Sequence, residues 1–252
     1  MKAKIKAGLL SALQICRREL TSYFTQPTAY AIIIIFLIFS LGLAFSLGQF
    51  MQYGDASLFI QFFQWHPWVY MIVAPALGMR LWSDEYRNNT VELLGTMPIP
   101  NWSLIVGKYF AAIAVSLLSL LLTFPIWISV NVLGSPDNLV IFSGYMASFL
   151  VGAAFIAVTS LVSAFTKDQV ICLLSSLLIC FCMVFFGFEG LLQPIAADMP
   201  EWLVELIASA TVFEHFNTIA QGNFRFLDLV WFVSIIVGCL FGTNIILSAK
   251  RA

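Results

Sequence analysis

Six long apolar stretches set the strongest limit on what this chain can fold into. They lie at residues 28–50, 58–82, 104–131, 143–166, 169–189 and 226–249. Each is close to the roughly 20 residues that an α-helix needs to cross a bilayer. Apolar residues make up 61% of the chain and charged residues 10%, whereas a soluble domain is about half apolar and about a quarter charged. We therefore predict an all-α integral membrane protein with six transmembrane helices in a single domain, residues 1–252, and exclude a large soluble catalytic domain.

The basic residues predict the orientation of these spans. Six spans place both termini on one side of the membrane, and Lys and Arg in short loops tend to stay cytoplasmic. With both termini inside, eleven of the twelve basic residues are cytoplasmic and only Arg225 is outside. We therefore expect cytoplasmic termini. The net charge of −1 gives no support for binding to nucleic acid.

Segment 1–27 has the pattern of an amphipathic helix. Apolar residues recur at spacings of three and four and form one stripe: Ile5, Leu9, Leu13, Cys16, Leu20 and Tyr23. A basic helix of this kind is expected to lie on the inner membrane surface. Pro27 is expected to end the helix and redirect the chain into the first span. A simple anchor without further function is an equally good interpretation.

Segment 83–103 is the most informative of the predicted cytoplasmic pieces. Asp84 and Glu85 stand where a helix N-terminus favours negative charge, and Gly95, Pro98 and Pro100 supply stop signals. The pattern predicts a short helix, residues 84–97, between the second and third spans. A solvated turn is the alternative that the chemistry alone leaves open.

This segment resembles the loop between the second and third spans of ABC-2 type permeases, the membrane subunits of ABC exporters. The matching residues are Glu85-Tyr86-Arg87, Thr90, Glu92, Leu93-Leu94 and Pro98-Ile99, continuing to Gly107-Lys108-Tyr109. Asn89 stands where the family usually has glycine. Arg17 to Tyr30 and Phe216 to Asp228 are similar to the family's first helix and to the stretch before its last span. The small six-span permeases of the gliding-motility type are the most similar subgroup.

The resemblance implies a cytoplasmic ATPase subunit, in two copies, and a second permease chain that is identical or homologous. The loop helix would be the coupling helix that docks on the ATPase, with these residues as contacts: Asp84, Glu85, Arg87, Thr90, Glu92, Leu93, Leu94 and Pro98. The sequence has no glycine-rich phosphate loop, because Gly107-Lys108 is followed by Tyr109. We therefore expect no enzymatic activity and no cofactor in this chain, with ATP and Mg bound by the partner ATPase. The resemblance also implies a multi-pass protein of the bacterial inner membrane.

Small residues in the first span suggest a close helix contact. Ser40, Ala44 and Gly48 recur every four residues, which lets two helices approach closely in lipid. In the family the dimer seam involves the first and fifth spans, so Cys172, Ser176, Phe181 and Phe185 would also border the seam or a translocation path. Packing within one chain is an equally good interpretation.

The outer segment, residues 190–225, is too long for a turn. It contains a short amphipathic pattern at 200–207. This element would cap the exit, bind an extracytoplasmic accessory protein, or serve as an interfacial anchor.

Two other classes of protein remain as alternatives to an exporter permease. An ion-coupled secondary transporter would carry acidic residues through its spans, and no such chain of residues is evident. A membrane redox protein would use His66 and His215, the only two histidines, as haem or metal ligands. Only the exporter needs the loop at 83–103.

Overall fold

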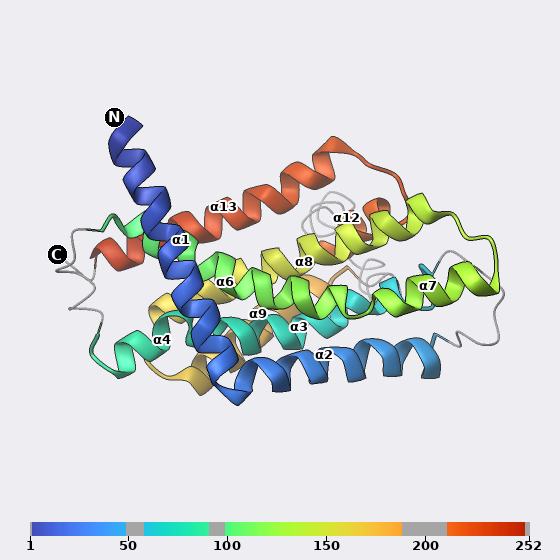
Figure 1. Cartoon of the computed structure of the whole chain (residues 1–252), viewed down its shortest axis with the longest axis horizontal. Helices are drawn as coiled ribbons and strands as arrows, with labels where there is room; N and C mark the ends of the chain where they lie inside the picture. Colours follow the sequence, from blue (N-terminus) through green and yellow to red (C-terminus); the bar gives the residue numbers. More distant parts are fainter. Residues whose placement is uncertain (1, 49–57, 91–98, 188–210, 250–252) are drawn as a thin grey trace, which may run out of the picture.

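The computed structural model describes residues 2–48, 58–90, 99–187 and 211–249, and its described elements are all helical. In chain order they are α1 (Lys2–Thr25), α2 (Pro27–Ser46), the short 3₁₀ helix η1 (Phe63–Trp65), α3 (His66–Gly78), α4 (Arg80–Arg87), α6 (Asn101–Leu121), α7 (Phe124–Leu133), α8 (Asn138–Phe165), α9 (Gln169–Phe185), α12 (Val212–Ala220) and α13 (Phe226–Ala249). Apart from α1, which crosses them obliquely, the long helices run along one common axis (Figure 1). The start of α6, α4 and the end of α13 lie together at one end of this bundle, and α7 lies at the other.

Helix α8 forms the centre of the bundle. It packs against α3, α6, α9, α12 and α13, and small residues on it let those helices approach. Gly144 lies against the ring of Phe63, and Gly152 lies against Tyr70. Small residues at these positions therefore serve packing within the chain, because an added Cβ would overlap the neighbouring rings.

Four helical stretches are long and apolar enough to cross a membrane: Pro27–Ser46, Asn101–Leu133, Asn138–Phe165 and Phe226–Ala249. They coincide with the predicted spans at 28–50, 104–131, 143–166 and 226–249. Only 11% of the apolar window of α13 is buried, so most of its apolar surface faces outward, as expected for a helix in lipid. Helix α9 begins with the predicted span 169–189 and ends at Phe185, and its 17 residues are fewer than a perpendicular crossing needs.

The predicted span at 58–82 is not one helix. It is divided into η1, α3 and α4, and α4 extends beyond it to Arg87. Pro75 lies within α3 and has no N–H to donate, so the helix is weakened shortly before it gives way to α4 after Met79. The six-span topology and the orientation of the termini stay predictions.

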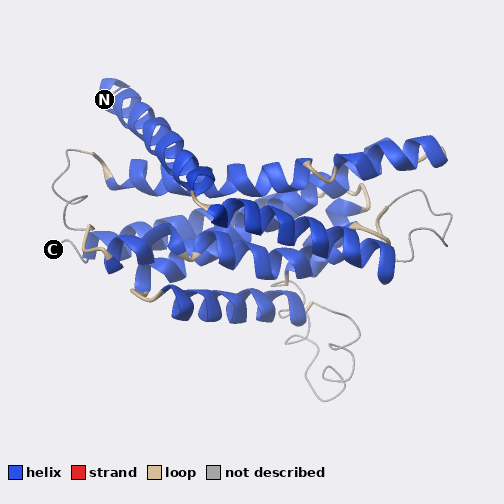
Figure 2. Ribbon diagram, turned by 60° about the horizontal axis from the view of Figure 1, so that its bottom comes forward, coloured by secondary structure: helices blue, strands red, loops and turns tan. Residues whose placement is uncertain are grey.

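Helix α1 is confirmed, with Pro27 opening α2 directly after it, but its packing face differs from the predicted stripe. Gly8 lies against Trp102, and Ala12 and Ile15 lie against Gly107 of α6. Leu9 and Leu13 of the predicted stripe face outward and are 57% and 69% exposed, whereas Leu20 and Tyr23 pack against the core. Figure 2 shows α1 leaving the bundle at a steep angle. Gly8, Ala12 and Ile15 therefore form the face that packs on protein, while Leu9 and Leu13 are free to contact a membrane surface.

Candidate functional site

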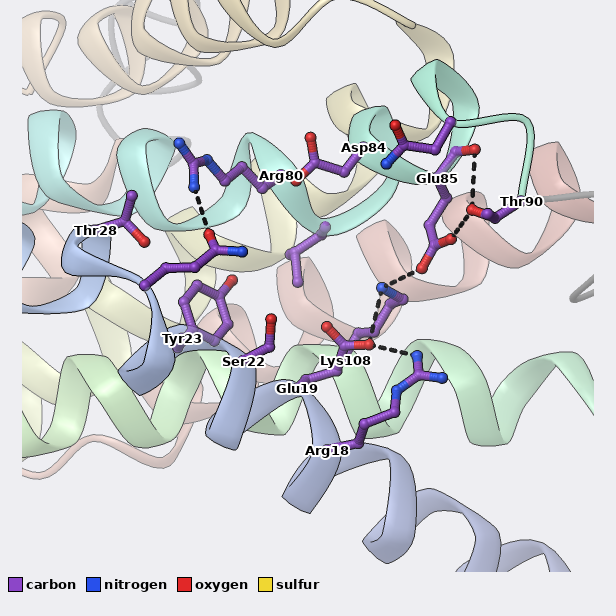
Figure 3. Close-up of a pocket in the computed structure, with 13 residues that line it drawn as sticks. Arg18, Glu19, Ser22, Tyr23, Thr28, Arg80, Asp84, Glu85, Thr90 and Lys108 are labelled. Atoms are coloured by element: carbon purple, nitrogen blue, oxygen red, sulfur yellow. Dashed lines mark hydrogen bonds and ion pairs between the residues drawn. The ribbon is translucent and has the colours of Figure 1, made fainter.

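A polar cleft of about 490 Å³ lies between the C-terminal half of α1, the start of α2, helix α4 and α6 (Figure 3). Thirteen residues line it: Arg18, Glu19, Ser22, Tyr23, Gln26, Thr28, Arg80, Leu81, Asp84, Glu85, Asn88, Thr90 and Lys108. Arg80 and Thr28 lie at one end of the cleft, while Glu85, Thr90, Lys108, Glu19 and Arg18 gather at the other. Six charged side chains therefore come together from three helices.

Ser163 of α8 fixes the start of α4. Its hydroxyl accepts hydrogen bonds from the backbone N–H of Trp82 at 3.0 Å and of Ser83 at 3.1 Å, and it donates to the carbonyl of Met79 at 3.2 Å. The first N–H groups of a helix have no partner within it, so a hydroxyl from a neighbouring helix replaces the usual N-cap. This contact places α4 so that Glu85 faces α6.

We call the end of the cleft formed by Arg18, Glu19, Glu85, Thr90 and Lys108 its closed end. Lys108 lies at the centre of this end. It is 3% exposed, although lysine is rarely buried without a partner. Its ammonium group lies 3.3 Å from a carboxylate oxygen of Glu19 and 3.0 Å from one of Glu85. It also lies 5.6 Å from the centroid of the Trp82 ring, within the range of a cation–π contact. One buried cation thus joins α1, α4 and α6.

The two carboxylates have further partners. Arg18 binds Glu19 at 2.7 Å, and the hydroxyl of Thr90 donates to the Glu85 carboxylate. Burial by itself raises the pKa of Glu85, but Lys108 and Thr90, with Arg18 farther off, outweigh burial and hold this pKa below its ordinary value. Glu85 is therefore ionised at neutral pH, and charges of alternating sign run from Arg18 to Glu85.

The turn after α4 explains the departure from the family's usual glycine. Asn89 has a φ of 55°, in the left-handed region that favours glycine and that asparagine tolerates best among other residues. The N–H of Thr90 donates to the carbonyl of Glu85 at 3.0 Å, and the N–H of Asn89 donates to that of Tyr86 at 3.3 Å. This is the Schellman pattern of helix termination. It brings the Thr90 side chain back onto Glu85.

One expectation about this segment is wrong. Asp84 and Glu85 do not begin a helix, because α4 begins at Arg80 and they lie in its C-terminal half. Negative charge is unfavourable there. It is offset by Lys108 on Glu85 and by Gln169 of α9, whose amide donates to the Asp84 carboxylate.

A comparison with protein families places this geometry in context. Residues 49–222 match the family described as ABC-2 family transporter protein. The chain belongs to the ABC-2 transporter family. A comparison with curated proteins found no match.

Membership makes the chain a membrane permease of an ABC transporter, a multi-pass protein whose family works with an ABC ATPase. The matched range contains α3, α4, α6, α7, α8, α9 and α12. Helix α1 lies before it and contributes Glu19 to the cleft. The ABC-2 permease therefore builds its cleft from two matched helices, α4 and α6, together with α1 and the start of α2, which precede the matched range.

The structure brings only part of the predicted ATPase-coupling set to this cleft. Asp84, Glu85 and Thr90 line it, and Arg87 is exposed at the end of α4. Glu92, Leu93, Leu94 and Pro98 lie outside the described residues, as does the amphipathic pattern at 200–207.

Sequence reasoning missed Lys108, Glu19 and Arg80 as site residues. A lysine within an apolar span was the available signal, because a charge in such a place is costly without partners. In the sequence, Gly107-Lys108 is informative only as part of the family pattern and as a phosphate loop that lacks its other residues.

The predicted dimer residues lie mostly inside the protomer. Ser40 and Ala44 are buried, and Gly48 lies against the backbone of Gln61, so the small-residue face of α2 packs within its own chain. Cys172 and Ser176 are also buried, with Sγ and Oγ 3.9 Å apart. Phe181 and Phe185 are half-buried, with ring centroids 4.9 Å apart. The structure favours intramolecular packing for Ser40, Ala44 and Gly48, and the dimer itself stays a prediction.

The two histidines have separate protein partners. The Nδ1 atom of His66 lies 2.6 Å from the hydroxyl of Ser148. That of His215 lies 2.6 Å from a carboxylate oxygen of Asp228, and its ring stacks on Trp231. Across the described ranges, no group of three His, Cys, Asp or Glu is placed to hold a metal ion. His66 therefore joins α3 to α8, and His215 joins α12 to α13.

Proposed function

We propose that this chain is the transmembrane subunit of an ATP-driven exporter. It would be coupled to a separate cytoplasmic ATPase through the end of the cleft that contains Glu85 and Lys108. The observation that carries the proposal is the buried Lys108. It forms ion pairs with Glu85, which belongs to the segment that resembles the family's loop, and with Glu19 of α1. Two permease chains and two ATPase subunits would form the complex in a bacterial inner membrane. ATP and Mg would bind to the ATPase subunits.

The geometry suggests how motion would spread from the loop. ATP binding would close the ATPase pair and displace the segment that follows α4. Because Glu85 is tied to Lys108, a displacement of α4 must either carry α6 with it or break the Glu85–Lys108 ion pair. The Glu19–Lys108 pair would pass a motion of α6 on to α1. A set of contacts with two discrete arrangements is what a switching transporter requires. The result would be export, or force transmitted to periplasmic partners.

The first experiment is a mild-detergent purification of the tagged chain from its native membranes, followed by mass spectrometry. We expect a stoichiometric cytoplasmic protein with a Walker A motif to accompany it. Recovery of the permease alone, with the ATPase shown to be stable in that detergent, would overturn the proposal and favour a secondary transporter.

A second experiment tests coupling within the purified complex. Glu85→Gln keeps the side-chain shape and removes the charge that Lys108 binds. We expect the complex to assemble while its ATPase activity no longer responds to the permease. Glu214→Gln, on exposed Glu214 of α12, is the matched control. Glu92→Ala and Leu93→Ala test the loop itself, and unchanged association and activity in both would argue against docking there.

A further inference from the structure

The Arg80 end of the cleft has the properties of a binding site for a phosphate group. The guanidinium donates one hydrogen bond, from Nη1 to the amide oxygen of Gln26 at 3.0 Å. Its Nε is buried and has no partner. Within the described ranges no carboxylate forms an ion pair with Arg80, since Asp84, one turn along the same helix, is held by Gln169. A buried guanidinium N–H without a partner is costly, and an anion in the cleft would accept from it.

The beginning of α2 adds donors of the kind that phosphate prefers. Gln26 precedes α2 without capping it, and Pro27 occupies its first turn. The N–H groups that follow have no partner within the helix, and the helix dipole favours negative charge at this end. The hydroxyl of Thr28 lines the same part of the cleft (Figure 3). Arginine, a hydroxyl and a helix N-terminus together match the oxygens of a phosphate group.

The exposed face of α2 beyond Thr28 favours a lipid as the source of the phosphate group. Ile35 and Phe39 lie two and three turns beyond Thr28 on the same face of α2, and both are exposed. Since α2 is a candidate membrane span, this face forms an apolar path that leads away from Arg80. A free phosphate ion would make no use of it, whereas the acyl chain of a lipid would lie along it.

We propose that Arg80, Thr28 and the first turn of α2 bind the phosphate head group of an acidic membrane lipid whose acyl chain follows the exposed face of α2. The site would hold the α1–α2 corner of the permease against the membrane surface. Placing the lipid in the inner leaflet rests on the proposed orientation. Binding itself needs neither that orientation nor the ATPase, so the test uses the purified permease alone.

The experiment measures binding to the full-length chain in detergent by thermal shift and by native mass spectrometry. Three probes separate the two parts of the ligand: dioleoyl phosphatidic acid, dioleoylglycerol with the same chains and no phosphate, and glycerol 3-phosphate with no chains. We expect phosphatidic acid to stabilise the protein and the other two to have little effect. Equal stabilisation by glycerol 3-phosphate would overturn the lipid source, and equal stabilisation by dioleoylglycerol would overturn the phosphate site.

Variants locate the binding. Arg80→Gln should weaken binding of phosphatidic acid about tenfold or more, because it removes charge-assisted hydrogen bonds. Arg87→Gln, on the same helix at an exposed position, should change it less than about twofold, as expected for one exposed charge. An equal loss in both variants would mean nonspecific attraction to surface charge and would overturn the site.

A second variant guards against misfolding. Thr28→Asp leaves the bond between Arg80 and Gln26 in place and puts an acidic residue in the first turn of α2, where the helix favours it. The new carboxylate would compete with phosphate for Arg80, so binding should fall as far as in Arg80→Gln. Gln26→Ala breaks the bond to Arg80 but keeps the cation, so it should retain most of the binding. Unchanged binding in Thr28→Asp would refute the proposal.

Discussion

The two ends of the cleft hold basic residues in opposite states. Lys108 is buried and bound by Glu19, Glu85 and the Trp82 ring. Arg80 is bound by one neutral amide and keeps a buried donor without a partner. The charge of Lys108 is neutralised inside the protein, so it holds three helices together. The charge of Arg80 is not, so it remains able to attract a ligand.

Replacing each cation by methionine tests this difference most directly. Lys108→Met leaves Glu19 and Glu85 as half-buried carboxylates without their shared partner, and it should cost about 3 kcal/mol of unfolding free energy. Arg80→Met loses one hydrogen bond to a neutral group and should cost about 0.5–1 kcal/mol. The measurement is SDS-induced unfolding in mixed micelles.

Lys167→Met, at an exposed position between α8 and α9, is the control for loss of a surface charge. Equal costs for Lys108→Met and Arg80→Met would show that the two ends of the cleft do not differ in the way proposed.

The closed end also depends on how closely α1 approaches α6. A Cβ added at Gly107 would lie 2.7 Å from the carbonyl oxygen of Ala12 and 2.9 Å from Ile15. Gly107→Ala should therefore push α1 away and lengthen the contact between Glu19 and Lys108, at a cost of about 2 kcal/mol. Gly238→Ala in α13 is the matched control, because a Cβ there meets nothing within 4 Å. The same unfolding measurement decides, and similar costs for the two variants would contradict close α1–α6 packing.

The pH dependence of stability gives a finer test of the closed end. The pKa of Glu85 lies below its ordinary value of 4.5, so its contribution is complete above pH 4.5 and is lost as the pH falls through the folded pKa. Glu85→Gln should cost about 1–2 kcal/mol at pH 7. The difference from the unsubstituted protein should then shrink below pH 4.5. Unfolding measured from pH 7 to pH 3 tests this. Glu214→Gln should show no such convergence, and a constant difference for Glu85→Gln would mean that its charge is not what stabilises the fold.

The sequence predicted the parts of the fold that hydropathy controls. Four of the expected spans coincide with long apolar helices, because lipid selects apolar residues along the whole length of such a helix. The division of residues 58–82 into η1, α3 and α4 was not predicted, since every piece of it is apolar enough to belong to one span. The packing face of α1 was missed for a related reason. Gly8 and Ala12 add little to hydrophobicity, yet their small size is what allows contact with α6.

The candidate site was predicted by location but not by composition. The loop pattern led to Asp84, Glu85 and Thr90, which all line the cleft. Lys108 and Glu19 lie in other helices, and no local pattern predicts that a buried ammonium group joins them to Glu85. The prediction that Asp84 and Glu85 begin a helix was wrong, because the preference of a helix N-terminus for negative charge is a weak effect. Ser163 of α8, far away in the sequence, sets where α4 begins.

The smallest expected effect concerns the turn that supplies Thr90 to the closed end. Asn89→Ala puts a residue with a Cβ and no polar side chain at a φ of 55°, which should cost about 1 kcal/mol. Asn89→Gly should cost nothing or stabilise slightly, because glycine adopts this conformation without strain. Asn88→Ala, at the neighbouring position with a φ of −89°, is the control and should stay within about 0.5 kcal/mol. Unfolding in mixed micelles again provides the measurement. If alanine were tolerated equally at both positions, the left-handed turn would not be needed to return Thr90 to Glu85. The ion pairs of Lys108 with Glu19 and Glu85 would then hold this end of the cleft without Thr90.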